Sequence, residues 1–353
     1  MSATIEKPAA PAQAAGEKMI EVVGVSRRFS KKLDIAGKIL AKLGAPIREE
    51  VVHAVDKVDL TIRKGEVVGL VGESGCGKST LGRMVAGILP PSDGTILWKG
   101  KDRTGMGGKE ARAAMLQAQM IFQDPMSSLN PRLKVAEIIG EAPLVHGLTS
   151  RAELARYVDE QMRRAGLDPA FKARYPHQFS GGQRQRIGIA RALAVQPEFL
   201  VCDESVAALD VSIQAQILNL FMALRRELNL TYLFISHDLG VVEHLSDRVV
   251  IMYLGRVVEE APTETVFARA NHPYTQSLLA AVPRIEARKK AFATVKGEIP
   301  SPLNPPSGCH FHPRCPHAFD RCRAEIPALQ EVAPGHKSRC HLNDLPNHGG
   351  QPV

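Results

Sequence analysis

The chain has 353 residues, of which 44% are hydrophobic and 23% are charged, and its formal net charge is +8. This composition excludes a chain that is collagenous, coiled-coil or disordered throughout, and the length allows one large domain or two modest ones. The basic excess is mild, so a solvated basic surface is favoured over nucleic-acid binding. No apolar run approaches the roughly 18 residues of a membrane-spanning helix, so any membrane role should be peripheral.

The N-terminal part of the chain predicts a tail, two strands and an insertion. Residues 1–18 are rich in Ala and Pro and lack a basic segment followed by an apolar one, so we expect a disordered tail, no secretory signal and a cytosolic chain. Apolar alternation over 20–28 and 51–62 predicts two strands. The intervening segment, 30–50, could form an amphipathic helix that contacts a partner or a membrane, but a surface insertion is favoured.

The middle of the chain alternates strands and helices. A buried strand over 66–71 leads through a Gly-rich turn into a helix over 79–89, which Pro90 and Pro91 end. Residues 133–179 carry helical spacing with a break near 166–169 and predict a helical subdomain. A helix over 183–195, a strand over 199–202, a helix over 211–227 and a strand over 231–235 follow. This alternation predicts a parallel sheet with helices on both faces.

The composition changes beyond about residue 283. Five prolines lie between 300 and 313, and four of the six cysteines lie between 309 and 340. We therefore expect a C-terminal extension that is separate from the preceding domain.

The Gly-rich turn over 72–79 fits the phosphate-loop pattern in full. It also follows a buried strand and precedes a helix, which is the position that such a loop requires. Glycines let backbone amides surround phosphate oxygens, Lys78 can reach the β and γ phosphates, and Ser79 can ligate magnesium. A Gly-rich turn without a ligand is the alternative. The loop consists of Gly72, Glu73, Ser74, Gly75, Cys76, Gly77, Lys78 and Ser79, and Thr80 follows it. Cys76 occupies a variable position of the pattern and is given no redox role.

Two carboxylates follow the strand over 199–202, where a phosphate-loop fold places its magnesium-positioning acid. Asp203 would hold magnesium through water, and Glu204 could polarise the water that attacks the γ-phosphate. The alternative is that the two acids only cap the next helix.

Four residues, Ser180, Gly181, Gly182 and Gln183, distinguish one class of nucleoside triphosphatase. With them the chain resembles the nucleotide-binding subunits of ATP-binding cassette (ABC) transporters, from about residue 20 to residue 340. The resemblance implies a phosphate-loop α/β fold of ABC type: a mainly parallel sheet, an antiparallel β subdomain, a helical subdomain (about 133–180) and a Cys-containing extension. It implies a nucleotide-binding domain over 19–283 and the extension over 284–353. In the family, the Ser-Gly-Gly-Gln helix start contacts the γ-phosphate of ATP on the opposite subunit, so two subunits close on two nucleotides.

The resemblance assigns four further residues. Gln123, after the strand over 120–122, is the lid-loop glutamine that senses magnesium and the attacking water, and His237 is the switch histidine that contacts the γ-phosphate. Asp210 ends the loop that crosses the dimer interface, where Ser205-Val206-Ala207 departs from the usual Pro-Thr-Ser. Phe29 is the aromatic residue nearest the adenine-stacking position, and a core role is its alternative.

Several stretches resemble one branch, the oligopeptide and dipeptide importers: 123–132, 210–216 and the tail over 309–340. The branch implies ATP hydrolysis that powers peptide import, with a second ATPase subunit as a heterodimer partner, two transmembrane permease subunits and an extracytoplasmic substrate-binding protein. The chain would lie peripherally on the cytoplasmic face of the inner membrane, with no nucleic acid bound. Glutathione or a nickel chelate are alternative solutes. A soluble ABC ATPase that acts on nucleic acid or ribosomes is the main alternative, and a phosphate-loop kinase or GTPase leaves Ser180 to Gln183 and His237 unexplained.

Four cysteines in a short, loop-rich segment of a cytosolic chain favour a metal centre over disulfides, and their spacing is not that of a zinc ribbon with two short Cys pairs. Four thiolates can hold a 4Fe–4S cluster, and the resembled importer subunits carry one in this tail, so iron–sulfur is preferred to zinc. Free reduced cysteines are the remaining alternative, and the expected role is structural. The four residues are Cys309, Cys315, Cys322 and Cys340.

Overall fold

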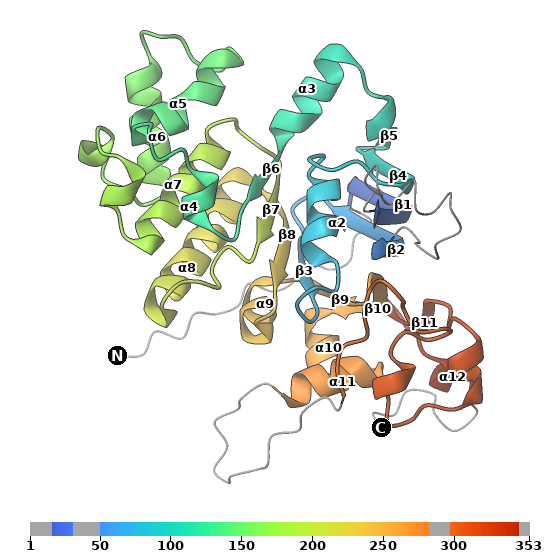
Figure 1. The fold of residues 1–353 in the computed structure, drawn as a ribbon. Helices are drawn as coiled ribbons and strands as arrows, with labels where there is room; N and C mark the ends of the chain where they lie inside the picture. Colours follow the sequence, from blue (N-terminus) through green and yellow to red (C-terminus); the bar gives the residue numbers. More distant parts are fainter. Residues whose placement is uncertain (1–15, 31–49, 282–296, 346–353) are drawn as a thin grey trace, which may run out of the picture.

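The computed structural model describes residues 16–30, 50–281 and 297–345 (Figure 1). Most of the predicted tail, most of the insertion over 30–50 and the domain boundary near residue 283 lie outside the described residues. Among the residues that are described, no helix combines the length and the apolar character needed to cross a bilayer.

The central sheet has eight strands in the order β11-β12-β10-β9-β3-β8-β7-β6. The five strands from β9 to β6 run parallel, as the alternation of strands and helices predicted. β3, β7 and β8 are buried along their whole length, which explains their continuous apolar sequences. The strands are β3 (Val67–Val71), β6 (Ala118–Ile121), β7 (Phe199–Asp203), β8 (Thr231–Ser236), β9 (Arg248–Tyr253), β10 (Arg256–Pro262), β11 (Gln330–Ala333) and β12 (His336–Ser338).

A second, antiparallel sheet has the order β2-β1-β4-β5. Its strands are β1 (Lys18–Ser30), β2 (Val51–Arg63), β4 (Asp93–Trp98) and β5 (Lys101–Asp102), and α3 (Gly108–Gln117) follows it. Trp98 packs edge-on against Phe199 with ring centroids 6.4 Å apart, so apolar contacts join this sheet to the central one. The predicted antiparallel β subdomain is therefore present.

Helices cover the central sheet and form a lobe beside it, seen in green and yellow in Figure 1. α2 lies so close to the sheet that a Cβ on Gly82 would collide with Ile235. The predicted helical subdomain contains α5 and α6, and the chain leaves α6 just before the break predicted near 166–169. The helices are α2 (Lys78–Val85), α4 (Pro125–Ser128), α5 (Val135–Val145), α6 (Leu154–Arg164), α7 (Gly181–Leu193), α8 (Val211–Leu228), α9 (Leu239–Leu245), α10 (Thr263–Arg269), α11 (Pro273–Ala280) and α12 (Asp320–Ala324).

The C-terminal extension is joined to the central sheet. β12 pairs antiparallel with β10, with Glu259 opposite Ser338. Glu259 is fully buried, and His336 Nε2 donates a 2.7 Å hydrogen bond to its Oε1. Burial alone would raise the pKa of Glu259, but this bond and the other groups around the carboxylate lower it below its usual value. The extension thus differs in composition from the preceding domain but continues its sheet.

Candidate functional site

The phosphate loop joins β3 to α2 and adopts a conformation that depends on glycine. Gly77 has a φ of 105°, and a Cβ there would collide with the backbone oxygen of Ala54 in β2. Only glycine fits a left-handed conformation against a neighbouring strand at this distance. The turn brings the N-terminus of α2, which carries partial positive charge, to the surface of the loop.

Lys78 is 4% exposed and lies along the inside of the loop. Its Nζ donates hydrogen bonds to the backbone oxygens of Gly72 at 2.6 Å and Glu73 at 3.0 Å. These bonds hold the ammonium within the loop, where it faces the space that a phosphate would fill. Burial raises the pKa of the neighbouring Cys76 thiol, which favours its neutral form.

Ser79 and Asp203 meet at the ends of two different elements. Ser79 Oγ donates a 2.7 Å hydrogen bond to Asp203 Oδ1, which β7 places beside the start of α2. Burial raises the pKa of Asp203, whereas the bond from Ser79 acts in the opposite direction. A hydroxyl and a buried carboxylate are oxygen donors of the kind that magnesium prefers. The pair therefore fits the predicted magnesium site. A bound cation would also favour the ionised form of the Asp203 carboxyl.

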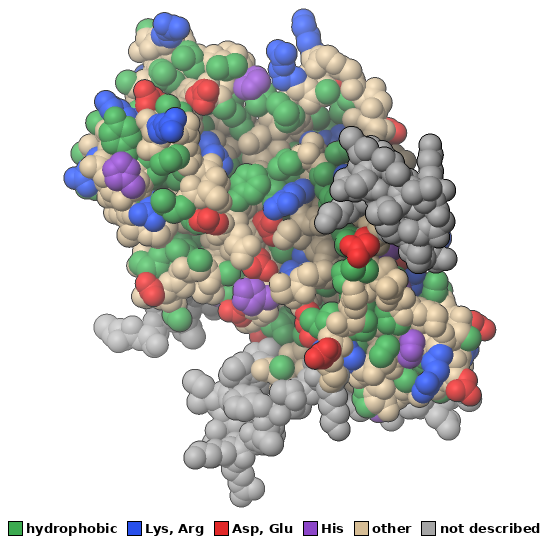
Figure 2. Space-filling view, viewed as in Figure 1, with side chains coloured by type: hydrophobic (Ala, Val, Ile, Leu, Met, Phe, Trp, Pro, Cys, Tyr) green, Lys and Arg blue, Asp and Glu red, His purple; other side chains and the backbone are tan. Residues whose placement is uncertain are grey.

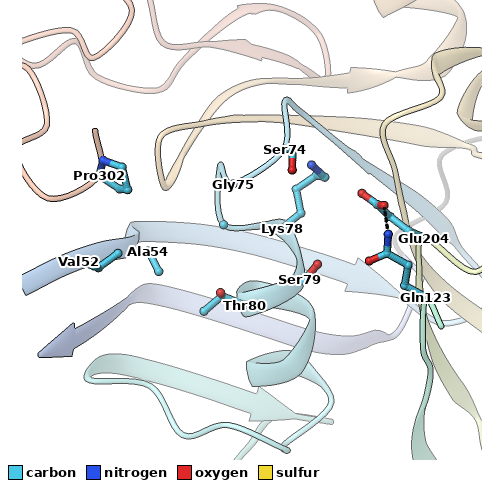
Figure 3. Close-up of a pocket in the computed structure, with 11 residues that line it drawn as sticks. Val52, Ala54, Ser74, Gly75, Lys78, Ser79, Thr80, Gln123, Glu204 and Pro302 are labelled. Atoms are coloured by element: carbon cyan, nitrogen blue, oxygen red, sulfur yellow. Dashed lines mark hydrogen bonds between the residues drawn. The ribbon is translucent and has the colours of Figure 1, made fainter. Parts of the chain in front are cut away.

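Glu204 lies at the centre of the site. Its φ is 45°, and its backbone nitrogen bonds to the oxygen of Ile235 in β8, which fixes this uncommon conformation. Gln123 Nε2 donates a 2.8 Å hydrogen bond to Oε2 of Glu204 (Figure 3). His237 Nδ1 lies 3.4 Å from Oε1 of the same carboxylate. The three predicted catalytic residues are thus brought together after the ends of β6, β7 and β8.

These groups surround a cavity of about 230 Å³ above the phosphate loop. A second cavity of about 420 Å³ lies next to it and shares Ser79 and Gln123 with it. Asp203 and Arg83 are also among the residues that line the second cavity. The first cavity is lined by Val52, Ala54, Ser74, Gly75, Gly77, Lys78, Ser79, Thr80, Gln123, Glu204 and Pro302 (Figure 3).

Three of the lining residues were missed by the sequence reasoning. Val52 and Ala54 come from β2, and Pro302 comes from the C-terminal extension. His53 in β2 donates its backbone N–H to the oxygen of Pro302 at 3.1 Å, which attaches the extension to the rim of the cavity. No motif marks these positions, because apolar strand residues and a proline in a Pro-rich segment carry no specific signal.

The Ser-Gly-Gly-Gln segment lies away from this cavity, at the start of α7. Ser180 and Gln183 form a capping box: Ser180 Oγ accepts from the backbone N–H of Gln183 at 3.3 Å, and Gln183 Oε1 accepts from that of Ser180 at 3.0 Å. Neither Gly181 nor Gly182 lines the first cavity. Within one chain this segment therefore does not contribute to the cavity above the phosphate loop.

Two other predicted residues also lie outside the cavity lining. Asp210 is the N-cap residue of α8. Phe29 is 40% exposed and pairs across the sheet with Val52, which does line the cavity, and Arg27 lies 4.8 Å above the Phe29 ring. Phe29 is thus a partly exposed ring beside a residue of the cavity lining, with the Arg27 guanidinium over one of its faces.

The four cysteines of the extension are free thiols that gather in one region. Burial, together with the charges that the other three would carry, raises the pKa of Cys340 to about 12. The backbone N–H of Cys309 also bonds to the oxygen of Cys322 at 2.8 Å. Within residues 16–30, 50–281 and 297–345, however, no group of three or more His, Cys, Asp or Glu side chains is arranged to hold a metal ion. The arrangement does not support the predicted iron–sulfur cluster.

Comparison with family models gives two matches. Residues 55–207 match the model described as ABC transporter, and residues 258–322 match that described as the C-terminal region of oligopeptide/dipeptide transporters. The second match begins within β10 and includes α10, α11 and the described extension as far as Cys322.

Individual proteins are similar over most of the chain. A probable peptide ABC transporter ATP-binding protein, y4tS, from Sinorhizobium fredii is 50% identical over 83% of each chain. The oligopeptide transport ATP-binding protein AppF from Bacillus subtilis is 51% identical over 82% of this chain and 90% of its own. Among solved structures, the dimeric ATP-binding cassette MJ0796 bound to ADP and Pi is 27% identical with a TM-score of 0.58, over 69% of this chain and 99% of that one.

Proposed function

Because this chain belongs to the ATP-binding proteins of oligopeptide/dipeptide ABC transporters, we propose that its site hydrolyses ATP to drive peptide import. The observation that carries the proposal is the convergence of Gln123 and His237 on the two oxygens of Glu204, beside the phosphate loop. A carboxylate held from two sides in this way can orient a water and accept its proton.

Each residue then has a defined task in the reaction. The loop amides and Lys78 bind the phosphates, and Ser79 with Asp203 holds the magnesium that neutralises charge on the phosphate oxygens. Glu204 accepts the proton of the attacking water, and Gln123 and His237 keep its carboxylate in line with the γ-phosphorus. Phe29 would stack on the adenine.

Catalysis requires a second ATPase subunit. Ser180 to Gln183 lie outside the cavity of their own chain, so the helix start at α7 is available to a nucleotide bound on a partner. The family pairs two subunits in this way, and Asp210 would lie in the loop between them. We propose a heterodimer with a second ABC ATPase, on the resemblance of residues 211–213 to the second type of subunit.

The other partners follow from the family. They are two transmembrane permease subunits and an extracytoplasmic binding protein that selects the solute, with this chain held peripherally at the cytoplasmic face of the inner membrane. On the face drawn in Figure 2, Lys and Arg side chains are dispersed among acidic and apolar ones. That nucleic acid is not a partner remains a prediction.

The 4Fe–4S cluster remains a prediction that rests on the resemblance and on the gathering of Cys309, Cys315, Cys322 and Cys340 in the extension. Iron and acid-labile sulfide measured on anaerobically purified chain test it. About four irons per chain support the cluster, and a chain free of both contradicts it.

The proposed function is tested by purifying the tagged chain from gently solubilised membranes and identifying the co-purifying subunits. Recovery of two membrane proteins and a second ATPase, with hydrolysis stimulated by the peptide-loaded binding protein, supports the proposal. A chain that instead purifies with ribosomes or nucleic acid contradicts it. Stimulation by glutathione or a nickel chelate, and not by peptides, assigns another solute.

A further inference from the structure

The phosphate-loop residue Glu73 points its side chain away from the cavity, toward the C-terminal extension. Arg314 Nη1 donates to Glu73 Oε2 at 2.7 Å, and Nη2 donates to Oε1 at 2.9 Å. This two-point arrangement fixes the direction of the carboxylate as well as its position. The Arg314 side chain is 4% exposed and that of Glu73 22%, so water has little access to the pair.

The backbone of Glu73 is held by α11, which packs against the extension through Tyr274 and Phe311. The Glu73 N–H donates a 2.9 Å hydrogen bond to the hydroxyl of Tyr274, which is fully buried in α11. The Tyr274 ring packs against Tyr253 at 4.7 Å and Phe311 at 5.3 Å between centroids, and Arg314 also donates to the Tyr253 hydroxyl at 3.4 Å. Side chain and main chain of one loop residue are thus anchored on a single aromatic cluster.

The anchored residue is in direct contact with the phosphate-binding lysine. The carbonyl of Glu73 accepts one of the two backbone-directed hydrogen bonds of Lys78 Nζ. Glycines at 72, 75 and 77 give the loop many backbone conformations, so holding it in one of them before nucleotide arrives reduces the entropy lost on binding.

We propose that Arg314 is a positioning residue for ATP: it fixes the phosphate loop through Glu73, so that the C-terminal extension forms part of the nucleotide site. The inference rests on the proposed ATP binding and adds to it a residue 241 positions away in the sequence. Removal of the guanidinium would leave a half-buried carboxylate without its cation, and that carboxylate would turn toward water and move the loop.

The test is a double-mutant cycle on the full chain with Arg314→Met, Glu73→Gln and the double variant. Equilibrium titration with a slowly hydrolysed ATP analogue and Mg²⁺ gives the dissociation constants. Each single change should weaken binding about 5- to 10-fold, and the double variant should be no weaker than either single one, because both remove the same interaction. In the assembled transporter, KM for ATP should rise more than kcat falls.

Two variants separate positioning from general stability. Arg314→Lys keeps the charge but not the two-point geometry, and it should give an intermediate affinity. Arg248→Met removes a comparably buried cation that bonds to Glu66 at 2.7 Å, at the opposite end of β3 from the phosphate loop. It should lower the melting temperature without changing ATP affinity.

Folded Arg314→Met or Arg314→Lys chains that bind the analogue as tightly as the wild-type chain would overturn the inference. If Arg314→Met does not fold, the Lys variant and Glu73→Gln decide. A wild-type chain that does not bind ATP at all contradicts the proposed function instead, so the two failures can be distinguished.

Discussion

Gln123 donates a 2.8 Å hydrogen bond to Glu204, although 81 residues separate them in the sequence. The bond links the loop after β6 to the end of β7, and His237 approaches the other carboxylate oxygen from the loop after β8. Since β6, β7 and β8 are adjacent parallel strands, their carboxyl ends meet at one edge of the sheet. A movement of any one of these loops would change the direction of the Glu204 carboxylate.

Glu204→Gln should retain ATP binding and lose turnover by about 100-fold or more, because an amide keeps the size of the side chain but cannot accept a proton from water. Single-turnover hydrolysis in the assembled transporter, with ATP affinity measured on the same sample, checks this. Glu198→Gln is the control, since the Glu198 side chain pairs with Lys99 just before the start of β7, at the opposite end of that strand from Glu204. Turnover within about twofold of wild type would exclude the general-base role.

His237→Ala should lower kcat about tenfold with little change in the affinity for ATP, since the side chain acts on the direction of Glu204. His237→Gln should restore part of the rate, because an amide can still donate to the carboxylate. In a Glu204→Gln background the loss caused by His237→Ala should nearly disappear. An equal loss in both backgrounds would mean that His237 acts independently of Glu204.

Asp203→Asn should raise the magnesium concentration needed for half-maximal activity about tenfold or more, because the neutral amide keeps the contact with Ser79 but lacks the charge. Burial raises the pKa of Asp203, so protons compete with magnesium at a higher pH than for an ordinary carboxyl. The magnesium requirement of the wild-type chain should therefore rise as the pH falls, and that of the variant should not. The surface change Asp159→Asn is the control.

His272 should make the folded state less stable in mild acid. Burial lowers its pKa from 6.5 to about 4, so between these values the unfolded chain binds a proton that the folded chain does not. The free energy of unfolding therefore falls as the pH drops through this window, by up to about 1.4 kcal/mol per pH unit. His272→Asn keeps an acceptor for the backbone N–H of Tyr274 and should flatten the dependence.

Thermal midpoints of both chains between pH 4 and 7.5 measure the effect. His244→Asn, at an exposed position of α9, should follow the wild-type curve. Parallel curves for His272→Asn and the wild-type chain would show that other groups control the acid sensitivity.

The sequence was most informative where the chemistry depends on neighbouring residues. The phosphate loop at 72–79 and the acids at 203 and 204 each follow a buried strand, so a local pattern was enough to place them. The contact of Gln123 with Glu204 needed knowledge of the strand order. The sequence and the resemblance assigned both residues to the attacking water but did not predict that they touch. Ser180 to Gln183 are absent from the lining of the cavity in their own chain, and their contact with nucleotide on a partner remains a prediction.

The sequence was least informative about the extension. Its Pro-rich composition predicted a separate piece, yet β12 adds to β10 and Pro302 reaches the cavity rim. Arg314 contacts Glu73 across 241 positions, and nothing near either residue signals the pair. Strands as short as β11 and β12 also contain too few residues to show a clear alternation of apolar and polar side chains.

The pairing of β10 with β12 also has a consequence for biosynthesis. Roughly 70 residues separate Pro262 from His336, so at about 5 to 20 residues per second the edge of β10 is translated several seconds before the strand that covers it. During that interval β10 presents unpaired backbone groups, including the carbonyls of Val257 and Val258 that Arg339 later occupies. Slow translation or premature termination in the last part of the message would therefore prolong exposure of an aggregation-prone sheet edge on the nascent chain.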